Sequence, residues 1–422
     1  MRRYRLNGHF DRRQFLQATG AAILLNPVGR WPSVALAQEP KARPRIAVIT
    51  TEYRGYSHAD VIVTRLIQGY ELSTTETYWP RTQIVSLFRD QVPAGDLSSG
   101  MAAQAGAKIV TSIRDALTLG TNQLAVDGVL IIGEHGNYPR NEKGQLTYPR
   151  RRFFEETVKT FQAVGATAPV FNDKGLSYSW DDAKWMYDQS RTMKFPLMAG
   201  SSLPTTWRRP DLDVPLGTKF EECLSIGYGD LDAYGFHALE TLQCMAERRQ
   251  GGETGIKSIA CLEGDAVWEA ARAGRWSRDL LDAAVNCVES KPAGTPEQRC
   301  KNPQLALIEY ADGLRASMIM LNGYTSAFGF AGRIQGQREP VATHFWLQEP
   351  EFGHFSYLVH NVEAMYRTGK EPYPVERTLL TTGILDAVLT SRFEQHRRIE
   401  TPWLSEVKYQ VGPDTGRRAK FS

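Results

Sequence analysis

A lysine at the end of a short apolar segment is the first residue of this chain whose position suggests chemistry. Lys174 and the preceding Asp173 follow Pro169–Asn172, a segment typical of a buried strand. In a parallel sheet, ligands bind beyond the carboxyl ends of the strands. An ammonium placed there can orient a hydroxyl or take part in proton transfer. Lys174 is therefore a candidate catalytic residue, and a solvated lysine is the alternative.

A second polar pair follows another apolar segment. Glu134 and His135 come directly after Gly128–Gly133, so a parallel sheet would bring them to the same edge as Lys174. The pair is suited to acid/base work or to binding substrate hydroxyls, and a packed loop is the alternative. Tyr178 lies near this predicted cleft and can stack on a sugar ring, although aromatic side chains more often belong to a core.

The turn after the first predicted strand, Ile46–Thr50, is the place to test for a dinucleotide site. Such sites need G-x-G-x-x-G, because the backbone must approach the pyrophosphate at a helix N-terminus. Gly55 is the only glycine in this turn, and Glu52 and Tyr53 would obstruct a pyrophosphate in the usual pose. The turn by itself argues against NAD.

An anion can still be held there in a different geometry. The candidate cofactor contacts are polar residues of the turn, the residue that ends the second strand and the residue that follows Gly128–Gly133, namely Arg54, Ser57, His58, Asp90 and Glu134. A structural cap or a substrate contact is the alternative for the turn.

Strands and helices alternate from residue 45 to about residue 202, which favours βαβ units and a doubly wound parallel sheet. We predict an α/β fold with a Rossmann-like domain over 45–204. An α+β domain with a mainly antiparallel open sheet is expected over 205–400, and a tail over 401–422.

Several segments together resemble the Gfo/Idh/MocA oxidoreductase family. They are Asp173-Lys174-Gly175, a capped helix that leads to Pro196–Gly200, and a helix with His237 in Tyr234–Glu240. The resemblance implies that NAD(P) binds in the first domain and a sugar, polyol or related substrate in the second. It also implies that Lys174 and His237 form the catalytic pair.

The chain departs from that pattern beside the histidine. The family's aspartate, four residues before the histidine, is Ala233 here, and Asp232 is out of register. Candidate substrate contacts are His135, Asp173, Asp232 and Tyr178. Three functions stay open: an oxidoreductase with tightly held NAD(P), a non-redox sugar-modifying enzyme that uses Lys174, His237 and Glu134, and a carbohydrate-binding protein without catalysis.

The N-terminus predicts export. Arg12-Arg13, the apolar stretch Ala18–Leu25 and Ala35-Leu36-Ala37 form the three regions of a signal peptide, and the paired arginines resemble a twin-arginine signal. We expect residues 1–37 to be removed, 38–44 to be a linker, and the protein to be periplasmic or secreted. The apolar stretch is too short to span a bilayer.

Charge and composition exclude several classes of protein. The chain has a net charge of +3, 42% hydrophobic and 23% charged residues, which is typical of a globular protein. Without the six arginines and one aspartate of residues 1–37, 44 basic residues face 46 acidic ones, so nothing favours nucleic-acid binding. No metal site is expected, and self-association is an open expectation. Cys287 and Cys300 are either bridged or free.

Overall fold

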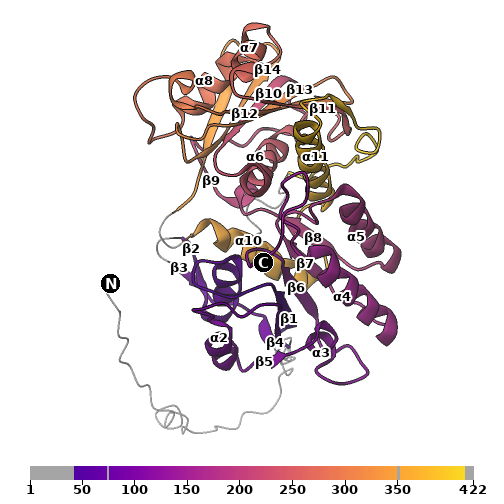
Figure 1. Ribbon diagram of the computed structural model, residues 1–422. Coiled ribbons are helices and arrows are strands. Elements are labelled where there is room, and N and C mark those ends of the chain that lie inside the picture. The colour runs from indigo at the N-terminus through magenta and orange to yellow at the C-terminus, as the bar shows by residue number, and fades with distance from the viewer. Residues whose placement is uncertain (1–41, 74–75, 349–351, 414–422) are drawn as a thin grey trace, which may run out of the picture. The chain divides into compact units, whose positions relative to one another are not determined.

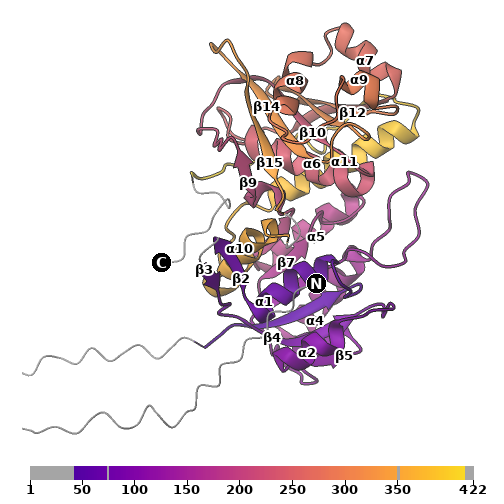
Figure 2. The same ribbon diagram turned by 90° about the vertical axis from the view of Figure 1, so that its left-hand side faces the viewer.

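The protein consists of two large β-sheets with their covering helices and one two-stranded hairpin, described here by a computed structural model (Figures 1 and 2). The structure describes residues 42–73, 76–348 and 352–413, so the predicted signal segment lies outside the described residues. Residues 43 onward form one unit. Within the described ranges, no helix has the length and apolar character needed to cross a membrane.

The first sheet is parallel throughout, as predicted. Its strands run in the order β5-β4-β1-β6-β7-β8, so the strand order reverses between β1 and β6. Such a reversal opens a crevice at the carboxyl ends of the two strands. The strands are β1 (Arg45–Thr50), β4 (Gln83–Arg89), β5 (Lys108–Val110), β6 (Gly128–Ile132), β7 (Val170–Asp173) and β8 (Leu197–Gly200).

Apolar side chains on both faces of these strands explain why helices cover both sides. All five residues of β6 are buried. One core includes residues of α3 (Ile113–Thr118), α4 (Arg150–Val164) and α5 (Trp180–Met193). The core on the other face includes residues of the π-helix η1 (Asp60–Thr64), α1 (Arg65–Gln68) and α10 (His354–Thr368). Helix α10, which lies late in the sequence, thus helps to cover one face of the first sheet.

Local signals account for where these helices begin and end. The Ser179 hydroxyl accepts the amide hydrogen of Asp182, which confirms the predicted cap of α5. Gly69, with a φ of +85°, ends the helix that follows β1. The chain then forms the hairpin β2 (Tyr70–Ser73) and β3 (Glu76–Tyr78), followed after β4 by α2 (Ser98–Ala105).

The second sheet has eight strands in the order β16-β11-β12-β13-β10-β14-β15-β9. Every pairing is antiparallel except β10 with β13, and the two end strands do not close on each other, so the sheet is open. The strands are β9 (Trp207–Arg209), β10 (Phe220–Gly227), β11 (Ile256–Glu263), β12 (Gln304–Tyr310), β13 (Arg315–Met320), β14 (Phe328–Ile334), β15 (Val341–Trp346) and β16 (Ile399–Glu400).

Helices also lie on both faces of the second sheet. On one face, α6 (Leu231–Ala246) and α11 (Glu376–Phe393) share a core with α4 and α5 of the first sheet. On the other face, α7 (Asp265–Arg272) and α8 (Arg278–Asn286) enclose a separate core. Two short elements, η2 (Leu203–Thr205) and α9 (Pro296–Arg299), complete the fold. Cys287 and Cys300 are free thiols in the structure.

Candidate functional site

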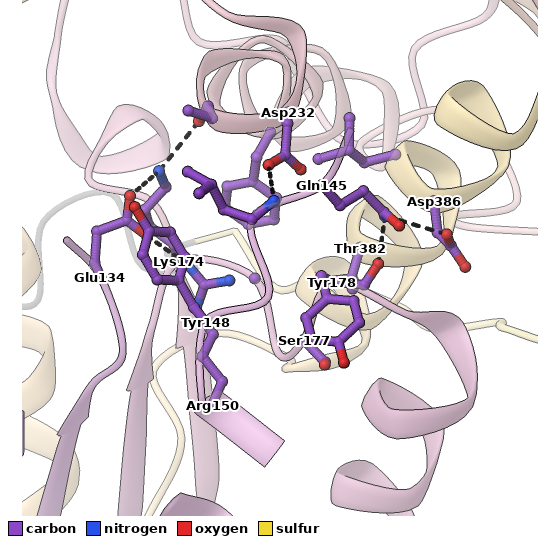
Figure 3. A pocket seen from close by; sticks show the side chains of 15 residues that line it. Glu134, Gln145, Tyr148, Arg150, Lys174, Ser177, Tyr178, Asp232, Thr382 and Asp386 are labelled. Atoms are coloured by element: carbon purple, nitrogen blue, oxygen red, sulfur yellow. Dashed lines mark hydrogen bonds and ion pairs between the residues drawn. The ribbon is translucent and has the colours of Figure 1, made fainter. Parts of the chain in front are cut away.

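Lys174 is held at the carboxyl edge of the first sheet by its own backbone. It follows β7 with a φ of +60°, and its amide donates to the Gly200 carbonyl at 3.1 Å. Its Nζ donates to Glu134 Oε1 at 2.9 Å and to the Ala233 carbonyl at 3.1 Å (Figure 3). An ammonium has three donors, so one remains for a ligand. At the position where the resemblance implies an aspartate, the backbone carbonyl of Ala233 thus accepts the hydrogen bond from Lys174.

Glu134 is the carboxylate that neutralises this lysine. It is buried after β6, and its second oxygen accepts from Arg150 Nη2 (Figure 3). Burial alone would raise the pKa of Glu134, but Lys174 and Arg150 together hold it well below its ordinary value. Glu134 therefore stays ionised and fixes Lys174 in place, which is a different role from that of a proton donor.

His237 lies on α6 one helical turn after Ala233. It is therefore one turn from the carbonyl that accepts the hydrogen bond of the Lys174 ammonium. Its Nδ1 is 2.6 Å from Ser201 Oγ, which also accepts the amide hydrogen of Leu203. Burial and then the nearby Lys174 lower the pKa of His237 well below its ordinary value. A neutral imidazole in a fixed orientation is suited to act as a general base.

Two further predicted histidines lie at the same edge. His58 Nδ1 is 2.6 Å from Asp173 Oδ2, and the rings of His58 and His135 are 5.3 Å apart. Burial, followed by the proximity of His58, lowers the pKa of His135 to about 4. The Nε2 atom of His135 is buried without a hydrogen-bond partner. The fold thus brings together residues predicted separately as cofactor and substrate contacts.

Sequence reasoning missed His354 as a member of this cluster. It begins α10, is buried, and its Nδ1 has no partner. Burial, together with Arg65 and His58, lowers the pKa of His354 to about 3. No local pattern connects His354 with residues at the ends of β1 and β7. Among the described residues, no group of His, Cys, Asp and Glu side chains is arranged to hold a metal ion.

A narrow cavity of about 30 Å³ lies beside Lys174 and Glu134 (Figure 3). This volume admits one water-sized group, so a larger ligand can bind only when side chains that line the cavity move. Asp232 lines the cavity, but its Oδ2 accepts the amide hydrogen of Leu146 at 2.8 Å, and burial raises its pKa. Tyr178 also lines it, and its carbonyl accepts from Gln145 Nε2 at 2.5 Å. Both predicted substrate residues therefore also position the loop between β6 and α4.

The turn after β1 does not present the cradle that a dinucleotide needs. With Gly55 as the third glycine of G-x-G-x-x-G, Glu52 takes the second place, where the backbone approaches the pyrophosphate. Its carboxylate is nearly buried and pairs with Arg54 at 2.6 Å. A fixed negative charge at that place opposes a phosphate.

Three amides around the start of the helix donate to side chains of the protein itself. Tyr56 N donates to Asp60 Oδ2 at 2.9 Å, and the amides of Arg54 and Asp60 both donate to Ser57 Oγ at 3.3 Å. Helix N-termini bind anions through free amides. Here the carboxylate of Asp60 accepts the amide hydrogen that an anionic ligand would otherwise accept. The contacts of Arg54 and Ser57 lie within the turn and stabilise its conformation.

Asp90, at the end of β4, is covered by the loop between β6 and α4. Its carboxylate accepts from Tyr138 Oη and from Arg152 Nη2, both at 2.7 Å. Gln91 exchanges hydrogen bonds with the backbone of Asn137. This loop lies where a nucleotide ribose would meet an acidic residue. The residues present therefore do not fit a dinucleotide in the usual Rossmann pose.

Comparisons with known proteins address the fold. No protein-family model matches the sequence, and no curated protein matches it. GenD2 from gentamicin A biosynthesis, solved with NAD, is similar at a TM-score of 0.53 and 13% identity, over 89% of this chain and 99% of GenD2. An apo scyllo-inositol dehydrogenase from Lactobacillus casei is similar at 0.52 and 11% identity, over 86% of this chain and 99% of that enzyme.

A myo-inositol dehydrogenase from Lactobacillus casei, solved with NAD(H) and myo-inositol, gives a TM-score of 0.50 at 11% identity, over 89% of this chain and all of that enzyme. Two of these three similar structures are inositol dehydrogenases. At such low identity the likeness concerns the arrangement of the elements. The chain shares the fold of these three proteins, a Rossmann-like parallel sheet followed by a mostly antiparallel one.

Proposed function

We propose that this protein is an enzyme of non-redox acid/base chemistry on a small polyhydroxylated substrate, a sugar or polyol derivative that carries a carbonyl. One observation carries the proposal. The ammonium of Lys174, fixed by Glu134 and by the Ala233 carbonyl, lies one turn of α6 from the neutral imidazole of His237. We call Glu134, Lys174 and His237 the acid/base site.

The arrangement supplies both groups that enolisation needs. His237 removes the proton from the carbon next to the substrate carbonyl, and the C–H electron pair becomes the new C=C bond. The carbonyl π pair moves to oxygen, where the remaining N–H of Lys174 stabilises the negative charge. When the electrons return, a hydroxyl on the next carbon leaves as water with the proton from imidazolium, or the carbon takes the proton back.

The second candidate function is oxidation of a sugar-type alcohol with NAD(P), which the resemblance to the Gfo/Idh/MocA family implies. The similarity over most of the chain to GenD2 solved with NAD, and to a myo-inositol dehydrogenase solved with NAD(H), favours it. Lys174 and His237 would then bind the alcohol and accept its hydroxyl proton. The cofactor would have to bind away from Glu52 and from the loop over Asp90.

The two candidates differ in what happens to carbon-bound hydrogen. We would incubate purified protein in D₂O with keto-sugars and sugar acids and follow deuterium incorporation and elimination by NMR. Lys174→Met and His237→Asn are expected to lose about 100-fold or more of the exchange rate. The exposed Lys159→Met is the matched control and should keep it.

Exchange that is equally fast in Lys174→Met, His237→Asn and the wild type would contradict the proposed mechanism. Bound NAD(P) released from native protein, or a rise in thermal stability on adding NAD(P), would establish the second candidate instead. The proposal expects neither result, because the carboxylate of Glu52 lies where the pyrophosphate would approach, and the amides of Tyr56 and Asp60 already donate within the turn.

We also propose export through the twin-arginine route, which the Arg12-Arg13 pair supports. Replacing both arginines by lysine in a reporter fusion should abolish translocation, and continued export would contradict it. Self-association stays a prediction that sedimentation of the purified protein would test.

A further inference from the structure

A second histidine at the carboxyl edge of the first sheet is bound to a carboxylate and has no part in the acid/base site. His58 lies at the start of the helix after β1, next to the reversal of the strand order, where sheets of this kind bind ligands. Its Nδ1 is 2.6 Å from Oδ2 of Asp173, the last residue of β7. A carboxylate only accepts, so Nδ1 carries the proton of this bond. We call His58 and Asp173 the histidine pair.

The other ring nitrogen of His58 is open. The side chain of His58 is 15% exposed and that of Asp173 is 1% exposed, so the pair presents its imidazole and encloses its carboxylate. Nε2 makes no hydrogen bond with the described residues, and it is not an enclosed atom. An imidazole with a bound Nδ1–H and an open Nε2 can take a proton from solvent and pass it to a ligand. His237, by contrast, is buried.

The strand ends that carry the acid/base site also carry the histidine pair. On β7, the residue that binds the imidazole directly precedes Lys174. After β6, Glu134 binds Lys174, and the next residue, His135, has its ring 5.3 Å from that of His58. The ring of Phe355 lies 5.3 Å from the opened imidazole as well. The imidazole of His58 is therefore held in a defined orientation beside the acid/base site.

The charges around the two histidines suit opposite roles. Burial, then Lys174 and His58, lower the pKa of His237, so a proton on His58 disfavours a proton on His237. The carboxylate of Asp173 offsets the charge of a protonated His58, whereas among the described residues no carboxylate hydrogen-bonds to His237. Environments that separate two titratable groups in this way assign one as acid and the other as base.

We propose that His58 is a further catalytic residue, the general acid that donates a proton to a leaving hydroxyl, and that Asp173 is its positioning residue. This role rests on the proposed function and narrows it to loss of water from a β-hydroxy carbonyl compound. After His237 has formed the enolate, an oxygen electron pair re-forms C=O, and the C=C pair moves to the bond with the next carbon. The C–O pair leaves with the hydroxyl on that carbon, which takes the Nε2 proton of His58 and departs as water.

Loss of water is the outcome that needs a second proton donor. Hydroxide leaves poorly unless it is protonated, and His237 alone is enough when the proton returns to the carbon from which it came. After the elimination, His58 regains a proton from solvent through its open nitrogen and His237 releases the one it removed. The protein thus returns to its starting state without an oxidant or a reductant.

Deuterium incorporation and loss of water separate the two roles. The protein is incubated in D₂O with D-fructose and 5-keto-D-gluconate, which carry a hydroxyl on the carbon next to the exchanging one, and both processes are followed by NMR. His58→Asn should slow loss of water about 100-fold or more. It should keep deuterium incorporation, because the enolate still forms and returns. His396→Asn is the matched control, since His396 is 40% exposed and lies 4.0 Å from Glu263, and it should keep both rates.

Two measurements test the histidine pair without a substrate. Diethyl pyrocarbonate, followed by mass spectrometry of peptides, should modify the open imidazole of His58 faster than the buried one of His237. Nitrogen-15 NMR should show neutral His58 with its proton on Nδ1, and Asp173→Asn should populate both tautomers. Asp173→Asn should also slow loss of water more than deuterium incorporation.

Loss of water at the wild-type rate in His58→Asn would overturn this role and leave the proposed function standing. Loss of both processes in a variant that keeps the wild-type melting temperature would place His58 in proton abstraction and overturn it too. Inversion at the exchanging carbon in place of water loss would assign the pair to epimerisation instead. A wild type that exchanges neither probe would refute the proposed function together with this role. Reactivity of His58 no greater than that of His237 would overturn this role for any substrate.

Discussion

Replacing Glu134 by Gln tests the electrostatic account of the acid/base site. Glu134 is buried and accepts from both Lys174 and Arg150. The variant leaves two buried cations facing an amide oxygen that carries no charge. Removing one partner of a buried ion pair costs about 3–5 kcal/mol. We expect about 3 kcal/mol, the lower end, because the Gln oxygen still accepts one hydrogen bond.

The effect should depend on pH in a defined direction. The folded protein holds the pKa of Glu134 below its ordinary value, so this carboxylate stabilises the fold above the unfolded-state pKa of about 4.3. That contribution declines as the pH falls from there toward the folded-state pKa. The difference in unfolding free energy between wild type and Glu134→Gln should be constant near neutral pH and shrink below about pH 4.3.

Urea unfolding followed by tryptophan fluorescence would measure this difference, with equal m-values as a condition. Glu240→Gln is the matched control with the opposite sign. Burial raises the pKa of Glu240 to about 7, so its contribution is present at low pH and lost as the pH rises through about 7. The unfolding free energy of Glu240→Gln should therefore increase relative to that of the wild type as the pH rises toward 7. A loss below about 1 kcal/mol for Glu134→Gln, or a loss that does not vary with pH, would refute the reasoning.

Three further results are expected. All five cysteines should react with a thiol reagent in denaturant without reductant, and only three would react if two of them formed a disulfide. In the native protein the reaction should be slow, because burial raises the pKa of each thiol. Gly128→Ala should cost about 1–3 kcal/mol by urea unfolding, since its Cβ would lie 2.5 Å from Tyr366 Cδ1, whereas Gly55→Ala, with open space around it, should lose less; equal losses would contradict this. Tyr138→Phe removes the hydrogen bond to Asp90 and should speed proteolysis of the loop after β6, and an unchanged cleavage rate would count against its role.

The first sheet was accessible from the sequence because each of its strands is a short apolar segment followed by polar residues. The same pattern is enough to predict that Lys174 and Glu134 lie at one edge of the sheet. Their direct bond follows from a single sheet register, since β6 and β7 are neighbours. When two strands are parallel neighbours and their carboxyl ends are known, the residues that follow them are expected to lie close together.

The remaining features depend on contacts distant in sequence. His354 joins the site only because α10 folds back on the first sheet. The carbonyl of Ala233 binds Lys174 through the backbone, which no side-chain pattern encodes. Asp90 is covered by Tyr138 from a loop whose path the strand pattern leaves undetermined. Sequence reasoning finds groups at strand ends, whereas burial and long-range pairing decide what those groups do.

The loop between β6 and α4 has a mechanical consequence. It bonds to Asp90 in the first sheet, to Asp232 at the start of α6, and through Lys143 to Asp386 and Thr390 of α11. One connection thus crosses from the first sheet to helices of the second. Any hinge motion that widened the crevice would have to break these bonds together. We therefore expect ligands to enter by local side-chain movement, and the two sheets to lose their amide protection in hydrogen exchange at the same denaturant concentration.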